Sequence, residues 1–171
     1  SSRRQRQMCI RDSSYAEGVG NAVIKSVEVE IGGQRIDKHY GEWLDIWGEL
    51  NVDANHKAAY RTMVGNSGTE GAESERGASK AERFYVPLRF WFNRNPGLAL
   101  PLIALQYHEV KLNFEFEEAS KVATCTGGTA TAPTAMTSCK LYTDYIYLDT
   151  DERRRFAQVS HEYLIEQLQH T

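Results

Sequence analysis

The chain has 171 residues, which is long enough for one domain with its own hydrophobic core. Hydrophobic residues make up 41% and charged residues 25% of the sequence, proportions that are ordinary for a soluble globular protein. No apolar run approaches the ~18 residues that suggest a membrane-spanning helix, so we predict no transmembrane segment.

The first 13 residues differ in composition from the rest of the chain. They contain four positive charges and one negative charge, namely Arg3, Arg4, Arg6, Arg11 and Asp12. Because residues 8–13 also resemble the translation of a sequencing adapter, we interpret segment 1–13 as a non-native assembly scar, with a basic arm for nucleic acid as the alternative. The segment contributes +3 to a formal net charge of −3, which leaves −6 for the remainder. An acidic body matches a phosphate backbone poorly, so direct nucleic-acid binding is disfavoured.

A β-hairpin is predicted near the start of the remaining chain. Residues 23–31, VIKSVEVEI, alternate between apolar and polar side chains, which indicates a strand with one buried face. The next pair, Gly32 and Gly33, can adopt the positive φ angles of a tight hairpin turn. Gln34–Tyr40 is then predicted as the returning strand.

Two helices are expected next. The first carries an amphipathic apolar stripe formed by Trp43, Leu44, Ile46, Trp47 and Leu50. We interpret its two tryptophans as part of a hydrophobic cap over a sheet. The second helix is predicted over Ala54–Val64 and ends at Gly65, a residue suited to a helix C-terminus. The polar, glycine-rich residues 65–82 are expected to form a long exposed loop.

Two further segments have the alternation of strands. In residues 84–92, Pro87 cannot donate to a ladder, so it marks an edge position or a bulge. Residues 139–148 carry large apolar or aromatic groups on both faces. We expect one of these faces to pack on the core and the other to meet a second layer or a subunit. Residues 120–138 are predicted as a loop.

Residues 93–117 combine a turn, a helical turn and a strand. The turn is expected at Pro96-Gly97, and a single helical turn follows with Pro101 near its start. The period then changes to two, and one strand face is formed by His108, Val110, Leu112, Phe114 and Phe116.

A short helix is predicted to begin at Asp149, with Glu152 as its capping-box partner. Residues 161–168 then return to an extended pattern. Strands separated by turns and short helical excursions indicate an antiparallel β-sandwich.

The sequence contains no catalytic, cofactor-binding or metal-binding constellation that we recognise. His161 lacks the second histidine of a zinc-protease motif, because Ile165 stands four residues later. His108-Glu109 lies on a strand where a cupin would place its metal, but no neighbouring ligand set accompanies it. We therefore predict structural roles for both histidines.

The charged run that starts at Asp149 offers two further candidates. A calcium loop beginning there would need glycine and glutamate where Arg154 and Ser160 stand, so helix capping explains the acids better. The run from Arg153 to Arg155 could grip phosphate, but a solvated face or an inter-subunit salt bridge is the favoured interpretation.

Cys125 and Cys139 remain once Cys9 is set aside with segment 1–13. They flank a loop and could approach each other, but two cysteines do not define a disulfide framework. A reduced pair is the preferred interpretation, and whether the two cysteines pair stays open.

Three blocks of the sequence resemble signatures of the major capsid proteins of nucleocytoplasmic large DNA viruses. They are residues 27–39 (VEVEIGGQRIDKH), 95–111 (NPGLALPLIALQYHEVK) and 144–167, which includes DYIYLD and HEYLIEQ. The resemblance extends in blocks over about residues 15–171, with the two predicted loops between them.

The resemblance implies an all-β fold, an antiparallel jelly-roll β-sandwich with short helices in the inter-strand excursions. Residues 14–171 would be an incomplete, partial N-terminal jelly roll of a double jelly-roll capsid subunit whose chain continues beyond both ends. Such subunits form homotrimers that look pseudo-hexagonal and that tile an icosahedral shell with neighbouring capsomers and minor capsid proteins. The expected location is the virion capsid, assembled in the host cell cytoplasm. No enzymatic activity, cofactor or small-molecule substrate is expected.

This role leaves the aromatic residues to be assigned. Trp43, Trp47, Trp91 and Tyr142 are candidates for burial in the core or in the trimer interface, and the sequence does not separate the two. One alternative is a jelly-roll carbohydrate-binding (lectin-like) module that uses aromatics such as Tyr142 and Tyr147. Their predicted position within regular strands favours packing instead. The other alternative is a cupin-like metalloenzyme, and the missing ligand cluster weighs against it.

Overall fold

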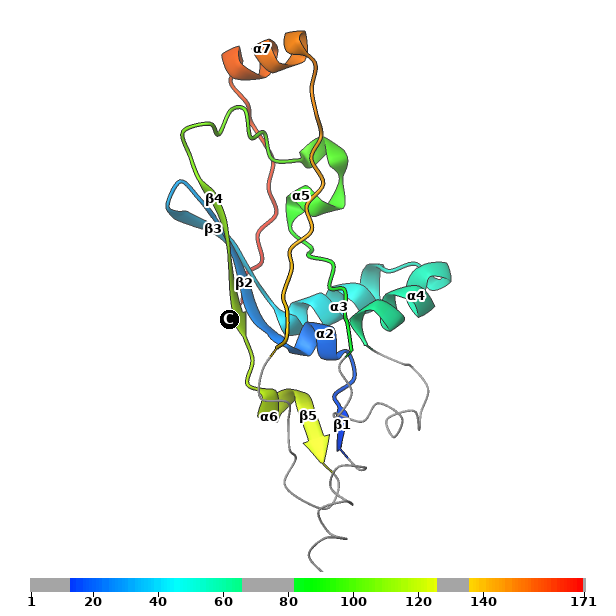
Figure 1. Cartoon of the computed structure of the whole chain (residues 1–171). Helices are drawn as coiled ribbons and strands as arrows, with labels where there is room; N and C mark the ends of the chain where they lie inside the picture. Colours follow the sequence, from blue (N-terminus) through cyan, green and yellow to red (C-terminus); the bar gives the residue numbers. More distant parts are fainter. Residues whose placement is uncertain (1–12, 66–81, 126–135, 171) are drawn as a thin grey trace, which may run out of the picture. The chain divides into compact units, whose positions relative to one another are not determined.

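The structure is a computed structural model of the chain and describes residues 13–65, 82–125 and 136–170 (Figure 1). The chain divides into two compact units. Unit 1 consists of Ser1–Ser26, Tyr40–Pro87 and Phe114–Thr137, and unit 2 consists of Val27–His39, Leu88–Asn113 and Ser138–Thr171.

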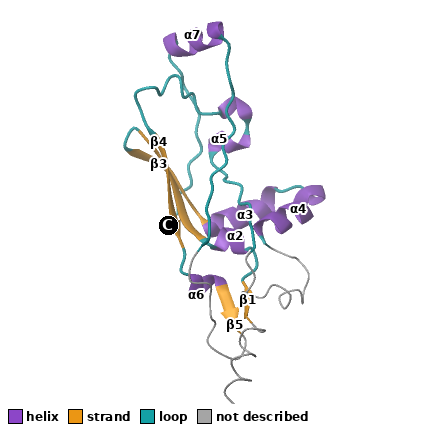
Figure 2. Ribbon diagram, viewed as in Figure 1, coloured by secondary structure: helices purple, strands orange, loops and turns teal. Residues whose placement is uncertain are grey.

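Small sheets and short helices make up the regular structure of the described residues (Figure 2). The strands are β1 (Ser13–Tyr15), β2 (Ile24–Ile31), β3 (Gln34–Tyr40), β4 (Val110–Phe116) and β5 (Ala123–Cys125). The helices are α2 (Val19–Ala22), α3 (Gly41–Asn51), α4 (Ala54–Val64), α5 (Trp91–Arg94), α6 (Ala119–Val122) and α7 (Thr150–Gln158), with a 3-10 helix η2 at Pro96–Leu98. One sheet has the strand order β3-β2-β4, and β1 pairs with β5 in a separate antiparallel sheet.

The predicted hairpin is confirmed. Gly32 and Gly33 have φ angles of 60° and 83°, the left-handed conformations that a two-residue turn between antiparallel strands requires. On the other side of β2, the Gly32 N–H donates to the Glu109 carbonyl (3.0 Å), and the Glu117 N–H donates to the Val23 carbonyl (2.9 Å). The beginning of β2 therefore lies beside the end of β4, and these two strands are antiparallel.

Unit 1 has an apolar core to which α3 contributes only part of its predicted stripe. The buried apolar residues of this unit are Val19, Ile24, Leu44, Val64 and Val122. Along α3, Leu44 is buried, whereas Ile46 and Leu50 are 51% and 78% exposed. Trp43 and Trp47 are half-buried. The stripe prediction is thus confirmed for Leu44 and wrong for Ile46 and Leu50, because no described part of unit 1 covers that side of the helix.

Two glycines in unit 1 stand where a side chain would not fit. A Cβ atom on Gly41 would lie 2.4 Å from the Ile24 carbonyl oxygen and 2.5 Å from that of Asn21. Gly65 ends α4 with a φ of 83°, which confirms the predicted helix terminus.

A polar cluster lies among the helices of unit 1. Asn21 is fully buried, and its Nδ2 donates to Asp45 Oδ1 (2.6 Å) and to the Tyr60 hydroxyl (3.3 Å). The Tyr60 hydroxyl donates in turn to the Leu44 carbonyl (3.3 Å). Partial burial raises the pKa of Asp45, and the hydrogen bond from Asn21 opposes that effect. The cluster ties α2, α3 and α4 together.

The core of unit 2 is formed by valines of β2 and by aromatic residues around α5. Val27, Val29 and Phe90 are fully buried, and Trp91 is 4% exposed. The Trp91 and Phe92 rings meet edge to face with centroids 5.0 Å apart, a favoured aromatic geometry.

The predictions of strands over residues 84–92 and 139–148 are wrong. Neither segment forms a strand, and Trp91 instead begins the helix α5. Pro87 has no N–H group to donate, and neither segment has a partner strand within the described residues. Alternating side chains are not sufficient for a strand, because a strand is completed only by the hydrogen bonds of its neighbour.

The helical turn at Pro101 and the strand β4 that follows it were both predicted from the sequence. The Ala104 and Leu105 N–H groups donate to the Pro101 carbonyl, which confirms a helical turn at that proline. The strand that follows begins at Val110, two residues later than the predicted His108.

The predicted capping box of α7 is confirmed as well. The Glu152 N–H donates to Asp149 Oδ1 (2.9 Å), and the Asp149 N–H donates to Glu152 Oε2 (3.3 Å).

The predicted loop 65–82 lies almost entirely outside the described residues, as do residues 1–12, 126–135 and 171. Within the predicted loop 120–138, the first residues instead form the end of α6 and all of β5, because β5 has a partner in β1. No helix in the described ranges is both long and apolar enough to cross a membrane.

Replacing Gly41 with alanine is expected to lower the free energy of unfolding by about 3 kcal/mol, because the new methyl group meets two backbone oxygens that cannot turn aside. Urea unfolding followed by tryptophan fluorescence measures the loss. The control is Gly97→Ala, where a Cβ would come no closer than 3.4 Å to a side-chain atom; its effect should stay within about 0.5 kcal/mol. Equal losses in the two variants would contradict this account.

Replacing Asp45 with asparagine is expected to remove a pH dependence. Because the folded-state pKa of Asp45 is raised above 3.8, this carboxyl favours folding at low pH, and that contribution is lost as the pH rises through the folded-state pKa. Wild type should therefore lose stability relative to Asp45→Asn over this rise, as measured by urea unfolding at several pH values. Asp144→Asn, at an exposed position, should show the same dependence of the free energy of unfolding on pH as wild type. If Asp45→Asn also showed the wild-type dependence, the raised pKa of Asp45 would be refuted.

Candidate functional site

A pair of ionisable side chains is buried on one face of β3. Asp37 and His39 are two residues apart on the strand and therefore point to the same side. Asp37 is only 4% exposed and His39 only 2%. The Nε2 atom of His39 lies 3.0 Å from Asp37 Oδ2. A buried carboxylate is costly unless partners compensate it, and the His39 ring is the side chain that lies against Asp37 here.

The aromatic core of unit 2 holds the His39 ring. The ring stacks on Phe90 with centroids 4.2 Å apart and an angle of 17° between the planes. Phe90 stacks in turn on Phe92, with centroids 5.5 Å apart. Packing therefore fixes the ring orientation that presents Nε2 to Asp37.

The other oxygen of Asp37 binds backbone. Oδ1 accepts a hydrogen bond from the N–H of its neighbour Lys38 (2.8 Å) and another from the N–H of Leu168 (3.2 Å). Hydrogen bonds to a charged acceptor are among the stronger ones in proteins. One carboxylate thus joins β3 to a segment 131 residues further along the chain.

Two neighbouring contacts strengthen this junction. The side-chain amide of Gln167 donates to the carbonyl of Ile36 on β3. Arg94, at the end of α5, forms an ion pair with Glu166. Three consecutive residues of the C-terminal segment are therefore held by separate groups of unit 2.

We call the Asp37–His39 pair, together with the contacts of residues 166–168, the Asp37 clasp. Among the described residues, β3 is at the edge of its sheet and has a strand neighbour on one side only. The clasp supplies β3 with further partners from the end of the described chain.

The geometry of the Asp37 clasp suits positioning better than reaction. A general base must reach the proton of a bound substrate, whereas both Asp37 and His39 are buried and face other groups of the same unit. In the part of the chain that the structure describes, no group of three or more His, Cys, Asp or Glu side chains is placed to hold a metal ion.

The histidines singled out from the sequence make separate local contacts. His108 is exposed, and its ring lies over the hairpin turn, where a Cβ on Gly32 would come 2.8 Å from its Nδ1. His161 stacks on Phe156, and its Nε2 lies 2.8 Å from the Phe156 carbonyl oxygen. Each therefore has a packing role in the described structure.

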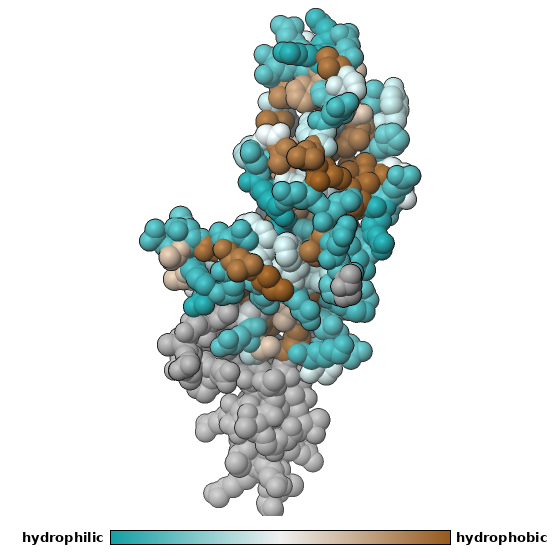
Figure 3. Space-filling model, turned by 180° about the vertical axis from the view of Figure 1, so that it is seen from behind, coloured by the Kyte–Doolittle hydropathy of each residue, from teal (hydrophilic) through white to brown (hydrophobic). Residues whose placement is uncertain are grey.

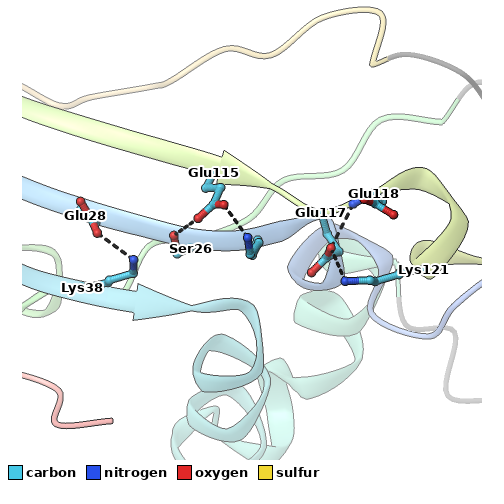
Figure 4. A network of polar contacts seen from close by, with 8 residues as sticks. Ser26, Glu28, Lys38, Glu115, Glu117, Glu118 and Lys121 are labelled. Carbon is cyan, nitrogen blue, oxygen red and sulfur yellow. Dashed lines mark hydrogen bonds and ion pairs between the residues drawn. The ribbon is translucent and has the colours of Figure 1, made fainter. Parts of the chain in front are cut away.

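Charged side chains are paired across the strands, as Figure 4 shows. Lys38, which alternates with Asp37 and His39 on β3, lies 2.8 Å from Glu28 on β2 and lowers the pKa of that carboxyl. Glu115 on β4 accepts from Lys25 and from Ser26 Oγ. Such surface pairs are screened by solvent, so they orient the strands more than they stabilise them.

Exposed apolar residues are concentrated in the irregular segment 139–148. The large ones are Leu141, Tyr142, Tyr145, Ile146 and Tyr147, and their exposed fractions range from 52% to 92%. Residues 139–147 are all exposed, so consecutive side chains of the segment lack cover. Figure 3 shows that apolar groups also reach the surface over α3 and α4. Contiguous exposed apolar surface of this kind marks interaction sites.

The structure separates two of the four aromatic candidates for core or interface. Trp91 is buried in the core of unit 2, and Tyr142 is 75% exposed. Trp43 and Trp47 are half-buried on α3. Tyr142 is therefore the member of this set that is available to a partner.

Cys139 is an exposed free thiol. The side chain of Cys125 lies outside the described residues, as does Cys9. The reduced pair of Cys125 and Cys139 therefore stays a prediction.

Comparison with known proteins gives consistent matches. The family model described as "Major capsid protein N-terminus" matches residues 5–149, a range that includes most of segment 1–13. A major capsid protein of Pyramimonas orientalis virus is 54% identical over 169 residues, covering 96% of this chain and 41% of the relative. A major capsid protein of Paramecium bursaria Chlorella virus 1 is 51% identical over 150 residues, covering 87% of this chain and 33% of the relative.

A solved structure has a similar fold. A chain of the PBCV-1 virus capsid superposes with a TM-score of 0.76 at 46% sequence identity, covering 95% of this chain and 38% of that one. The present chain thus spans between one third and about two fifths of the length of these proteins.

Replacing Asp37 with alanine is expected to lower the free energy of unfolding by about 3–5 kcal/mol, because His39 then stays buried without its partner and the Leu168 N–H loses its acceptor. Urea unfolding measures the loss. Proteolysis of the folded variant should also become faster within residues 160–170. Asp144→Ala removes an exposed carboxylate and should change stability by less than about 0.5 kcal/mol. A similar small effect for Asp37→Ala would show that the clasp does not hold the segment.

Proposed function

The chain belongs to the family of major capsid proteins, and from this membership we propose that it is part of a structural subunit of a virus shell. The observation that carries the proposal is the 54% identity over nearly the whole chain, supported by the fold match to a virus capsid chain. The relatives are capsid proteins and not lectins or cupins, so neither of those alternatives is proposed.

The proposed subunit is a double jelly roll, and residues 14–171 form part of its first jelly roll. The three-stranded sheet β3-β2-β4 supports this proposal as a part of one such sheet. Two features support the existence of further strands. Residues 139–148 expose large apolar groups, and β3 has a strand neighbour on one side only among the residues that the structure describes. Both features fit a sandwich that is completed by additional chain.

The proposed assembly is a homotrimer that packs with neighbouring capsomers and minor capsid proteins in an icosahedral shell. A closed trimer uses heterologous contacts, in which one patch of a subunit meets a different patch of the next. The exposed apolar groups of α3 and of segment 139–148 supply surfaces of different composition, as such contacts require. The proposed location is the virion, with assembly in the host cytoplasm.

A non-enzymatic role fits the chemistry of the described residues. The charged groups that are buried or strongly held serve the Asp37 clasp, the cross-strand pairs and the α7 cap, all of which fix backbone segments. A shell subunit needs such rigidity, and it needs no group kept free for reaction.

The flanking DNA tests the proposed extent of the protein. The reading frame is expected to continue beyond both ends of the chain for more than the present length, because the chain covers only 41% of a close relative. The same DNA tests the scar interpretation, since the native upstream sequence should then differ from residues 1–13. Stop codons close to both ends would contradict the proposal.

The product of the recovered reading frame is expected to sediment as a trimer at micromolar concentration. Sedimentation-velocity centrifugation gives the mass directly, and unfolded protein is recognised by its circular dichroism. A folded product that remains monomeric would overturn the capsid proposal.

A further inference from the structure

Helix α7 (Thr150–Gln158) makes little contact with the rest of unit 2. None of its residues is buried, and Phe156 alone is half-buried among exposed neighbours. Phe156 stacks on His161, with ring centroids 4.9 Å apart. Figure 3 shows the corresponding surface, at the top of the view, as largely hydrophilic.

Such a helix has few means of stabilising itself. It is nine residues long, whereas isolated helices shorter than about 12–15 residues are marginal in water. The capping box of Asp149 and Glu152 contributes about 1 kcal/mol, which offsets only part of the cost of ordering the segment. A helix of this length and exposure is better explained by a partner that covers it.

The exposed side of α7 carries three consecutive arginines. At 100° per residue, Arg154 lies nearly opposite the inward-facing Phe156, and Arg153 and Arg155 lie on either side of it. The helix therefore presents positive charge over most of its free circumference.

These arginines have little compensation inside the chain. Arg154 is 3.8 Å from Asp151, and both side chains are largely exposed. Arg153 and Arg155 form no ion pair with any described residue. The remaining acids of this segment are already engaged in the capping box.

We propose that α7 is an interface helix whose arginines dock on carboxylates of a second copy of this protein. This inference rests on the proposed function and specifies one contact between copies in the proposed trimer. The charge balance supports a second copy as the occupant, because the chain outside segment 1–13 carries a net charge of −6. Arginine binds carboxylates through paired hydrogen bonds and is enriched in protein interfaces.

The spread of the arginines argues against a small anion. A single phosphate is held by side chains that converge on one point. The three arginines of α7 are distributed over about 200° of the helix, so they fit an extended acidic surface better. A heterologous contact, basic α7 against an acidic patch elsewhere on the next copy, also meets the requirement of a closed trimer.

Zero-length cross-linking tests this contact in the product of the full reading frame. The variant Arg153→Lys/Arg155→Lys keeps the charges and introduces amines that a carbodiimide joins to carboxylates in direct contact. Mixed trimers of ¹⁴N- and ¹⁵N-labelled copies distinguish links between copies from links within one copy by mass spectrometry. We expect links from position 153 or 155 to Asp or Glu of the other copy, and these links should disappear at high salt.

Charge reversal gives a second, independent measurement. Arg155→Glu should weaken trimer association at least about tenfold in sedimentation experiments, while circular dichroism shows an unchanged fold. Arg35→Glu is the matched control, because it makes the same charge change at an exposed position of the same unit; it should leave association unchanged.

The outcomes separate this inference from the capsid proposal. Trimers that form normally in Arg155→Glu, without links from α7 to another copy, would overturn the role of α7 and leave the shell subunit in place. Links from α7 only within one copy would show that another segment of the same chain covers the helix. This result would also overturn the interface role of α7. Wild-type protein that never forms trimers would overturn the proposed function itself.

Discussion

The burial of one carboxylate constrains how unit 2 is built. Asp37 lies on the core side of β3, where an uncompensated charge would cost several kcal/mol. His39 compensates one oxygen, and the N–H groups of Lys38 and Leu168 compensate the other. The stack of His39 on Phe90 holds the compensating ring in place. The strand, the aromatic core and the C-terminal segment therefore depend on one another, and loss of any one removes a partner from the other two.

The parts of the fold that could be predicted from the sequence are those set by neighbouring residues. The Gly32-Gly33 turn, the end of α4 at Gly65 and the capping box at Asp149 each depend on backbone geometry within a few positions, and all three are confirmed. The strands expected over 84–92 and 139–148 depend on partners elsewhere, which alternation of side chains does not specify.

The Asp37 clasp shows the same limit more clearly. The sequence block 27–39 contains both members of its ion pair, spaced by two as a strand face requires, so a local signal was present. The structural role of the pair depends on its contacts with Leu168 and Phe90, which are distant in the sequence. The resemblance to capsid proteins identified the block without explaining it, whereas the contacts explain it as a junction between segments that hold each other in place. A family signature can thus record packing rather than chemistry.

Exposed apolar surface and paired charges have different consequences for a shell subunit. The cross-strand ion pairs are satisfied within the chain and contribute little to association. Tyr147 and Leu50, at 92% and 78% exposure, are unfavourable in an isolated chain, yet their burial in an assembly returns about 25 cal/mol for each Å² removed from water. In the proposed assembly, these exposed apolar residues favour association. The proposed shell subunit gains from surfaces that stay uncovered until its partners arrive.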